Sequence, residues 1–106
     1  MTNEFAYNIR KHNASVELYI DRGDAEENKS IFDTIQGSKD TIEAEFGEPL
    51  QWQRLEGKRA CRIMKSIEIG GYRDDESKWP EIQDAMIDAM IKLEKALRQH
   101  IEGLRV

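Results

Sequence analysis

The sequence is poor in the residues that build cross-links and in long apolar runs. Its one cysteine, Cys61, can form no internal disulfide and cannot supply a cysteine-rich zinc site. No apolar run approaches the roughly eighteen residues that a membrane-spanning helix needs, and the N-terminus has no secretory apolar segment. These absences favour a reduced, cytoplasmic protein without membrane contact.

Positive charge is also scarce. The 16 lysines and arginines stand against 21 aspartates and glutamates, so the formal net charge is −5 at pH 7. Sequence-independent binding to nucleic acid depends on Lys and Arg side chains that neutralise phosphates. The composition therefore disfavours a nucleic-acid partner, although a local basic patch would escape this average.

What is present suits one folded domain. Hydrophobic residues make up 39% of the 106 residues, which is enough for one core. We expect a single domain, 1–106, whose halves, about 1–49 and 50–106, share a topology although their sequence identity is slight.

The first half begins with a predicted hairpin. Residues 4–10 and 15–21 each alternate between apolar and polar side chains, and the short polar link 11–14 joins them. A period of two in adjacent runs is typical of paired strands. The apolar faces comprise Phe5, Tyr7 and Ile9 in the first run and Val16, Leu18 and Ile20 in the second.

A long helix is predicted next. Asp24 is an N-cap candidate, with Glu27 at the capping-box position, and a helical apolar stripe continues to Phe46. Gly47 is placed to end this helix. Gly37 costs about 1 kcal/mol relative to alanine in a helix interior, but the stripe keeps its phase across it. We therefore expect the helix to run through Gly37.

The second half repeats this order. Residues 50–55 and 60–69 predict two strands joined by the turn 56–59, and Ser77 is the expected N-cap of a final helix with Pro80 in its first turn. The apolar stripe of that helix comprises Trp79, Ile82, Met86, Met90, Leu93, Leu97, Ile101 and Leu104.

These elements predict an α+β fold of ββαββα order. A four-stranded, mainly antiparallel sheet with two helices packed on one face buries every apolar stripe at once. The other sheet face is expected to remain exposed to solvent or to contact a partner. It would carry Asn8, Arg10, Glu17, Tyr19, Gln51, Gln53 and Arg62.

The strongest catalytic pattern is the E-x-K sequence of Glu56 and Lys58. Restriction-type nucleases use such residues on a strand, where carboxylates hold a divalent metal and the lysine assists the attacking water. Here Gly57 lies between two strand patterns, which is typical of a hairpin turn. The turn is the favoured interpretation.

Other reactive side chains give weaker signals. The acidic run 74–76 precedes a helix, where negative charge interacts favourably with the helix N-terminus. His12 and His100 have no partner at metal-ligand spacing, and Cys61 is expected to be a buried apolar residue, with a minor alternative as a thiolate near Arg59. We expect no catalytic residue, metal or cofactor.

Two groups of residues are candidates for binding. A basic cluster is a possible anion or partner patch, although nearby acidic side chains favour simple charge balance. On the final helix, Ile87 and Ile91 widen the apolar stripe and are candidates for contact with a second subunit. The basic cluster comprises Arg54, Lys58, Arg59, Arg62 and Lys65.

Several segments resemble a bacterial and archaeal domain family of unknown function. They are VELYID (16–21), ENKSIF (27–32), IEAEFGE (42–48), WQRL (52–55), KRACRI (58–63) and WPEI (79–82). The resemblance implies a domain that usually ends a larger protein, often after a restriction-endonuclease-like region. It implies DNA-related or defence-related surroundings and carries over no catalytic residue.

Together these observations predict a non-enzymatic accessory or interaction domain that binds a protein partner or a second copy of itself. The alternative is a nucleic-acid-binding accessory domain that uses the basic hairpin and the open sheet face. A small metal-dependent nuclease built on Glu56 and Lys58 is the third and least favoured hypothesis.

Overall fold

A computed structural model describes residues 2–21 and 23–102 and confirms the α+β prediction. Each of the two β-hairpins is followed by helices, and no helix of the described part is long and apolar enough to cross a membrane. The elements are β1 (Thr2–Ile9), β2 (Ala14–Asp21), α1 (Ala25–Gln36), α2 (Lys39–Phe46), β3 (Gln51–Gln53), β4 (Cys61–Ile67), the 3₁₀ helix η1 (Glu76–Lys78) and α3 (Trp79–Glu102).

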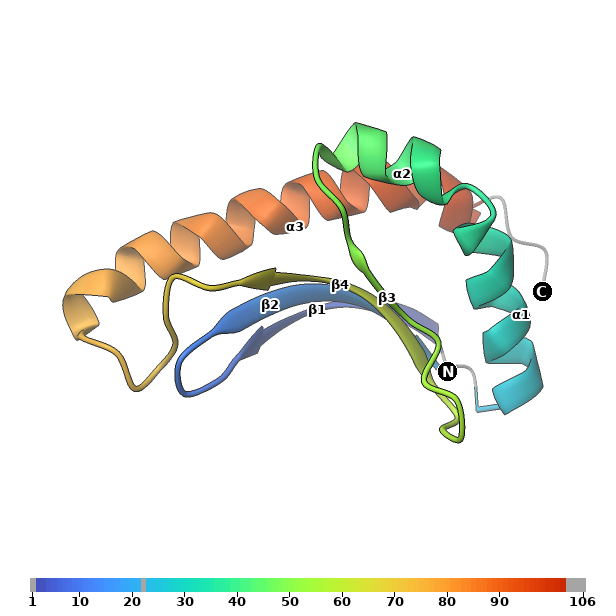
Figure 1. Ribbon diagram of the computed structural model, residues 1–106, viewed down its shortest axis with the longest axis horizontal. Coiled ribbons are helices and arrows are strands. Elements are labelled where there is room, and N and C mark those ends of the chain that lie inside the picture. Colours follow the sequence, from blue (N-terminus) through green and yellow to red (C-terminus); the bar gives the residue numbers. More distant parts are fainter. Residues whose placement is uncertain (1, 22, 103–106) are drawn as a thin grey trace.

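The four strands form one antiparallel sheet in the order β1-β2-β4-β3. Leu18 at the centre of β2 lies opposite Phe5 on β1 and opposite Ile63 on β4. The helices lie on one side of the curved sheet (Figure 1). The long β1 and the three-residue β3 are therefore the two edge strands.

The core lies between the sheet and the helices, and strand alternation determines which side chains enter it. Val16, Leu18 and Ile20 of β2 are completely buried. Helices α1, α2 and α3 cover them with most of the stripes predicted from the sequence. Trp79 is an exception, because it is 38% exposed and lies outside the core, and Leu104 lies outside the described residues. The helical contribution comprises Ile31, Phe32, Ile35, Ile42, Phe46, Ile82, Met86, Met90, Leu93, Ala96 and Leu97.

The prediction of one helix across Gly37 was wrong, because the chain turns there between α1 and α2. The Ser38 amide donates to the Ile35 carbonyl at 3.0 Å, which tightens the last turn, and Ser38 leaves helical geometry at φ −108°. Helix α1 packs on β2 and β4, whereas α2 packs on α3. The turn thus lets one continuous stripe bury its two halves against different neighbours (Figure 1).

The helix caps agree with the sequence at two sites and differ at a third. Asp24 caps α1 by accepting from the Glu26 amide at 3.2 Å, and Gly47 ends α2 at φ 100°. Ser77 was predicted to cap the last helix, but it lies within η1. Asp75 caps η1, which leads directly into α3, because its side chain accepts from the Ser77 amide at 3.0 Å.

Candidate functional site

Lys29 of α1 holds the β3–β4 loop in place. Its ammonium group donates to the carbonyl oxygens of Arg54 at 2.6 Å, Lys58 at 2.9 Å and Ala60 at 3.1 Å, and it also reaches Leu55 at 3.2 Å. This half-buried ammonium group thereby donates hydrogen bonds to carbonyl oxygens that take no part in the hydrogen bonds between strands. Sequence reasoning missed this role because no motif links a helical lysine to a loop 25 residues away.

Cys61 lies beside this anchor and is fully buried. Its thiol donates to the Arg54 carbonyl at 3.2 Å, and the Lys29 ammonium nitrogen lies 3.4 Å from its sulfur. Burial raises the pKa of the Cys61 thiol, and Lys29 offsets only part of this rise. The thiol is therefore protonated at neutral pH, which counts against the alternative of a reactive thiolate.

Arg54 and Arg59, two members of the basic cluster, are each held by a carboxylate. Arg54 makes a two-point contact with Asp33, at 2.9 and 3.0 Å, and also pairs with Glu56. Arg59 binds Asp21 at 2.7 Å, and this hydrogen bond is the main reason that the pKa of Asp21 is lowered. These pairs join the β3–β4 loop to α1 and to the end of β2.

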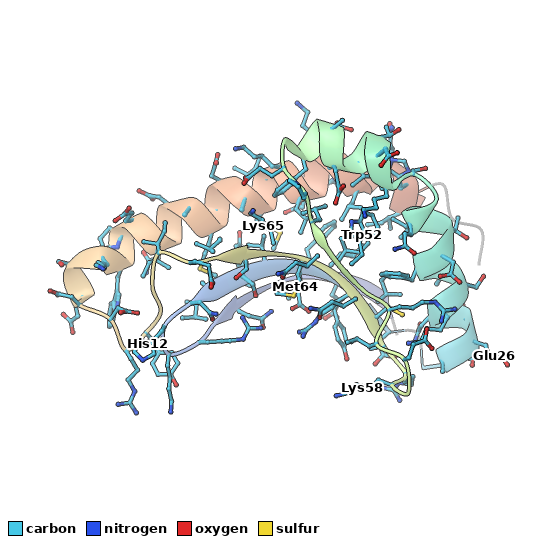
Figure 2. The ribbon with its side chains drawn as sticks, in the orientation of Figure 1. His12, Glu26, Trp52, Lys58, Met64 and Lys65 are labelled. Carbon is cyan, nitrogen blue, oxygen red and sulfur yellow. The ribbon has the colours of Figure 1, made fainter. Side chains whose placement is uncertain are left out.

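Arg62 and Lys65 lie on opposite faces of β4, so they cannot share a patch with one another. The Arg62 guanidinium lies 3.6 Å from the Glu17 carboxylate on the open face, whereas the Lys65 ammonium lies 3.1 Å from the Glu48 carboxylate on the helix side. Figure 2 shows Lys65 and Met64 on the two sides of β4 and Lys58 at the distant tip of the loop. The five cations are therefore dispersed, and four of them face acidic partners within the chain.

The open sheet face differs from the prediction at Glu17, which is 4% exposed. Asn8 donates to the Glu17 carboxylate at 2.5 Å, and Ala6 and Met64 lie opposite it on the two neighbouring strands. A charged residue in mid-strand is thus covered by its cross-strand neighbours. Tyr19, by contrast, remains 37% exposed on the same face.

Glu56 and Lys58 lie on a hairpin turn, as the sequence predicted. The Lys58 amide donates to the Leu55 carbonyl at 2.9 Å, and Gly57 takes the left-handed backbone conformation at φ 82°. The Arg54 guanidinium donates a hydrogen bond to the Glu56 carboxylate, so this carboxylate has a partner within the chain. Within the part of the chain that the structure describes, no three His, Cys, Asp or Glu side chains group as metal ligands.

At the opposite end of the sheet, the loop 70–75 docks on the β1–β2 turn. The amides of Tyr72 and Arg73 donate to the carbonyls of Arg10 and Lys11, each at 2.9 Å. A Cβ atom on Gly71 would lie 2.0 Å from the Arg10 carbonyl oxygen, so only glycine fits this approach.

Asp74 has a different role from the helix-terminus contact predicted for it. Its carboxylate accepts from the Gly71 amide at 2.7 Å and lies 3.5 Å from the His12 ring. The Gly71 hydrogen bond is the main cause that lowers the pKa of Asp74. Asp74 therefore helps to hold the loop on the hairpin, while His100 lies in the last turn of α3 as predicted.

This docked end exposes apolar side chains. Six large hydrophobic residues on β1, on the loop and on α3 are between 38% and 61% exposed, and a hollow of about 220 Å³ lies among Ile9, Tyr72 and Trp79. We call this set the apolar flank. It comprises Tyr7, Ile9, Tyr72, Trp79, Ile87 and Ile91.

Helix α3 presents Ile87 toward the β1 side. Ala85 and Ala89 face the opposite side, because they line a depression with Phe46 of α2 and Ile67 of β4. Successive helical residues are separated by about 100°, so Ile87 points about 200° away from Ala85. Ile87 is therefore exposed on the side of α3 that faces away from α2 and β4.

The model for a family described as "Domain of unknown function (DUF4268)" matches residues 2–101. This match covers nearly the whole chain, so the chain belongs to that family. No curated protein and no solved structure matches the sequence significantly.

Proposed function

We propose that this member of the DUF4268 family is a non-enzymatic interaction module that binds a protein partner through the apolar flank. One observation carries the proposal: the hollow of about 220 Å³ among Ile9, Tyr72 and Trp79 is lined by large hydrophobic side chains that are 38% to 50% exposed. Monomeric proteins rarely expose extended apolar patches without a binding role. Aromatic anchors such as Tyr72 and Trp79 are also typical of interface centres.

The polar end of the molecule supports the same choice. Its cations Arg54 and Arg59 are engaged by Asp33 and Asp21, and the E-x-K pair lies on a turn. A substrate or an anion would have to displace these internal contacts before it could bind. The apolar flank needs no such rearrangement, because its side chains are already exposed.

We extend the proposal to the biological setting through the sequence resemblance. The resembling domains accompany restriction-endonuclease-like regions, so we propose that the module serves a nuclease-associated protein. The reading frame and neighbouring genes in the native genome test this extension. Finding no nuclease-like region within the same protein or beside its gene would contradict it.

Photo-cross-linking in native cells tests the interaction role. A benzophenone amino acid at Tyr72 should give a covalent adduct of defined mass, because this exposed side chain lines the hollow of the apolar flank. The matched control is the same amino acid at Tyr19, an exposed tyrosine on the open face. Absence of an adduct at Tyr72, or the same adduct from both positions, would contradict the proposed function.

The alternative, a nucleic-acid contact through the basic cluster, is tested separately. Because four of its cations face carboxylates, we expect no retention of single- or double-stranded DNA on filters at low salt, even at roughly tens of micromolar protein. Retention that falls steeply with salt and is lost on Lys58→Ala would favour the alternative instead.

A further inference from the structure

The edge strand β1 has a backbone side with no neighbouring strand in the described chain, since β1 pairs only with β2. The Arg10 amide donates to the Asn13 carbonyl at 2.8 Å, so the backbone N–H of Arg10 points toward the β2 side of the hairpin. In an antiparallel pair, alternate residues exchange both hydrogen bonds with the neighbour. It follows that the amide and carbonyl groups of Phe5, Tyr7 and Ile9 point outward.

Edge strands that pair with no further strand usually carry a feature that prevents pairing with another chain, such as proline, lysine, a bulge or short length. Strand β1 has eight residues, contains neither proline nor lysine, and keeps a continuous register with β2 from Thr2 to Ile9. Its helix-facing side carries exposed Tyr7 and Ile9 of the apolar flank. Strand β1 therefore combines unused backbone groups with uncovered apolar side chains.

We propose that the occupant of this edge is a second copy of the same chain, whose β1 pairs antiparallel with the first about a two-fold axis at Tyr7. The inference rests on the proposed function, because it names the partner that covers part of the apolar flank. The product is a continuous eight-stranded sheet with the helices of both copies on the same side.

The axis at Tyr7 matches the apolar side chains. Phe5 of one copy lies opposite Ile9 of the second copy, and Tyr7 lies opposite its own equivalent. All three residues have outward-facing backbone groups, so these pairs are the hydrogen-bonded ones.

Charge complementarity selects this register over its neighbours. Glu4 and Arg10 are three residues on either side of Tyr7, so each Glu4 faces Arg10 of the second copy on the open sheet face. Neither has an ion-pair partner among residues 2–21 and 23–102 of its own chain. With the axis moved to Ala6, Glu4 would face Asn8, and at Asn8 it would face His12.

Charge reversal tests the register. Sedimentation equilibrium of the full chain should give the mass of two copies, and Glu4→Arg or Arg10→Glu should each weaken dimerisation by about tenfold, because like charges then meet twice across the axis. The double variant should return the dissociation constant to within about threefold of the parent. Circular dichroism confirms that each variant is folded.

A cysteine on the axis tests the same geometry without changing charge. Opposed residues in an antiparallel pair have Cα atoms about 5.5 Å apart, within disulfide range. Tyr7→Cys should therefore cross-link to itself under mild oxidation. Ile9→Cys, equally exposed on the same strand, should not, because its equivalents lie four positions apart in this register. The parent chain controls for buried Cys61.

The outcomes separate this inference from the proposed function. A chain that stays monomeric at high concentration while Tyr72 cross-links to another polypeptide overturns the inference and leaves the interaction role intact. A dimer in which Ile9→Cys cross-links as readily as Tyr7→Cys overturns the edge pairing. Failure of the double charge reversal to restore dimerisation overturns the Glu4–Arg10 register.

Discussion

The two edge strands of the sheet, β3 and β1, lie in different surroundings, and we call their two sides of the sheet the β3 end and the β1 end. At the β3 end the edge strand has only three residues, and Lys29, Arg54 and Arg59 tie the adjoining loop to helix α1 and strand β2. At the β1 end the edge strand has eight residues and its neighbouring surface is apolar. One end is closed by internal polar contacts, whereas the other has exposed apolar side chains and an edge strand that pairs only with β2 in the described chain.

This difference shows that a cluster of charges in the sequence does not indicate which groups the fold leaves without an internal partner. The basic cluster attracts attention in the sequence, yet its members are mostly occupied within the chain. Unused interaction capacity lies instead where backbone groups and apolar side chains have no internal partner. The following predictions test each end of the comparison, beginning with the largest effect.

Removing the ammonium group of Lys29 should open the closed end. Lys29→Met keeps the side-chain length but leaves several loop carbonyls without a donor, so we expect the free energy of unfolding to fall by about 2–4 kcal/mol. Urea denaturation measures this change. The control Lys58→Met, at the exposed loop tip, should change it by less than about 0.5 kcal/mol. Equal effects of the two variants would contradict the anchoring role.

Adding one methyl group at Gly71 should undock the loop at the other end. Because the new Cβ would lie 2.0 Å from a backbone oxygen, Gly71→Ala should lower the free energy of unfolding by about 1–3 kcal/mol. Hydrogen exchange should show lost protection at the Tyr72 and Arg73 amides, while the β3–β4 loop keeps its protection. Unchanged protection at those two amides would show that the close approach is not rigid.

Acid should weaken the closed end more than the docked loop. The pKa values of Asp21 and Asp33 are lowered chiefly by hydrogen bonds from Arg59 and Arg54, and that of Glu43 by the Leu50 amide. A carboxyl whose pKa is lower in the folded chain stabilises it above the unfolded pKa, near 4, and loses this contribution as pH falls through the folded value.

The free energy of unfolding should therefore decline as the pH drops below about 5, and Asp21→Asn should make that decline shallower. The docked loop has one such carboxyl, Asp74, and should respond less. Denaturant titrations from pH 7 to pH 3 provide the measurement. A parallel decline in the parent and the Asp21→Asn variant would contradict the role given to Asp21.

The thiol of Cys61 reports on the closed end in the native state. Because it is buried and its pKa is raised, alkylation at pH 8 should be at least roughly a hundredfold slower than in the unfolded chain. Lys29→Met should accelerate this reaction by opening the loop. Rapid native-state alkylation would mean that the end is not closed.

Much of the fold was predictable from local patterns. Alternation identified the buried faces of β2 and β4, and capping residues such as Asp24 and Gly47 marked helix ends. The break after Gly37 was missed because the apolar phase is the same on both sides, while the two halves pack on different elements. Periodicity describes which face of a helix is buried but not against which neighbour.

The candidate site was predictable only in part. Ile87 and Ile91 were identified from the width of the helical stripe, and the structure places both on the surface. The remaining members of the apolar flank were assigned to the core pattern or to loops. Tyr7 and Ile9 lie at the alternating apolar positions that are typical of buried strand residues. They are exposed because β1 lies at the edge of the sheet.

The sequence by itself determined the α+β class, the strand faces and most helix ends, because these follow from side-chain periodicity and from contacts within a few residues. Tertiary structure decided which strands became edges, which carboxylate met each cation, and that Lys29 and Gly71 hold the two loops. Those outcomes depend on the spatial register of segments that are far apart along the chain, and no local pattern encodes that register.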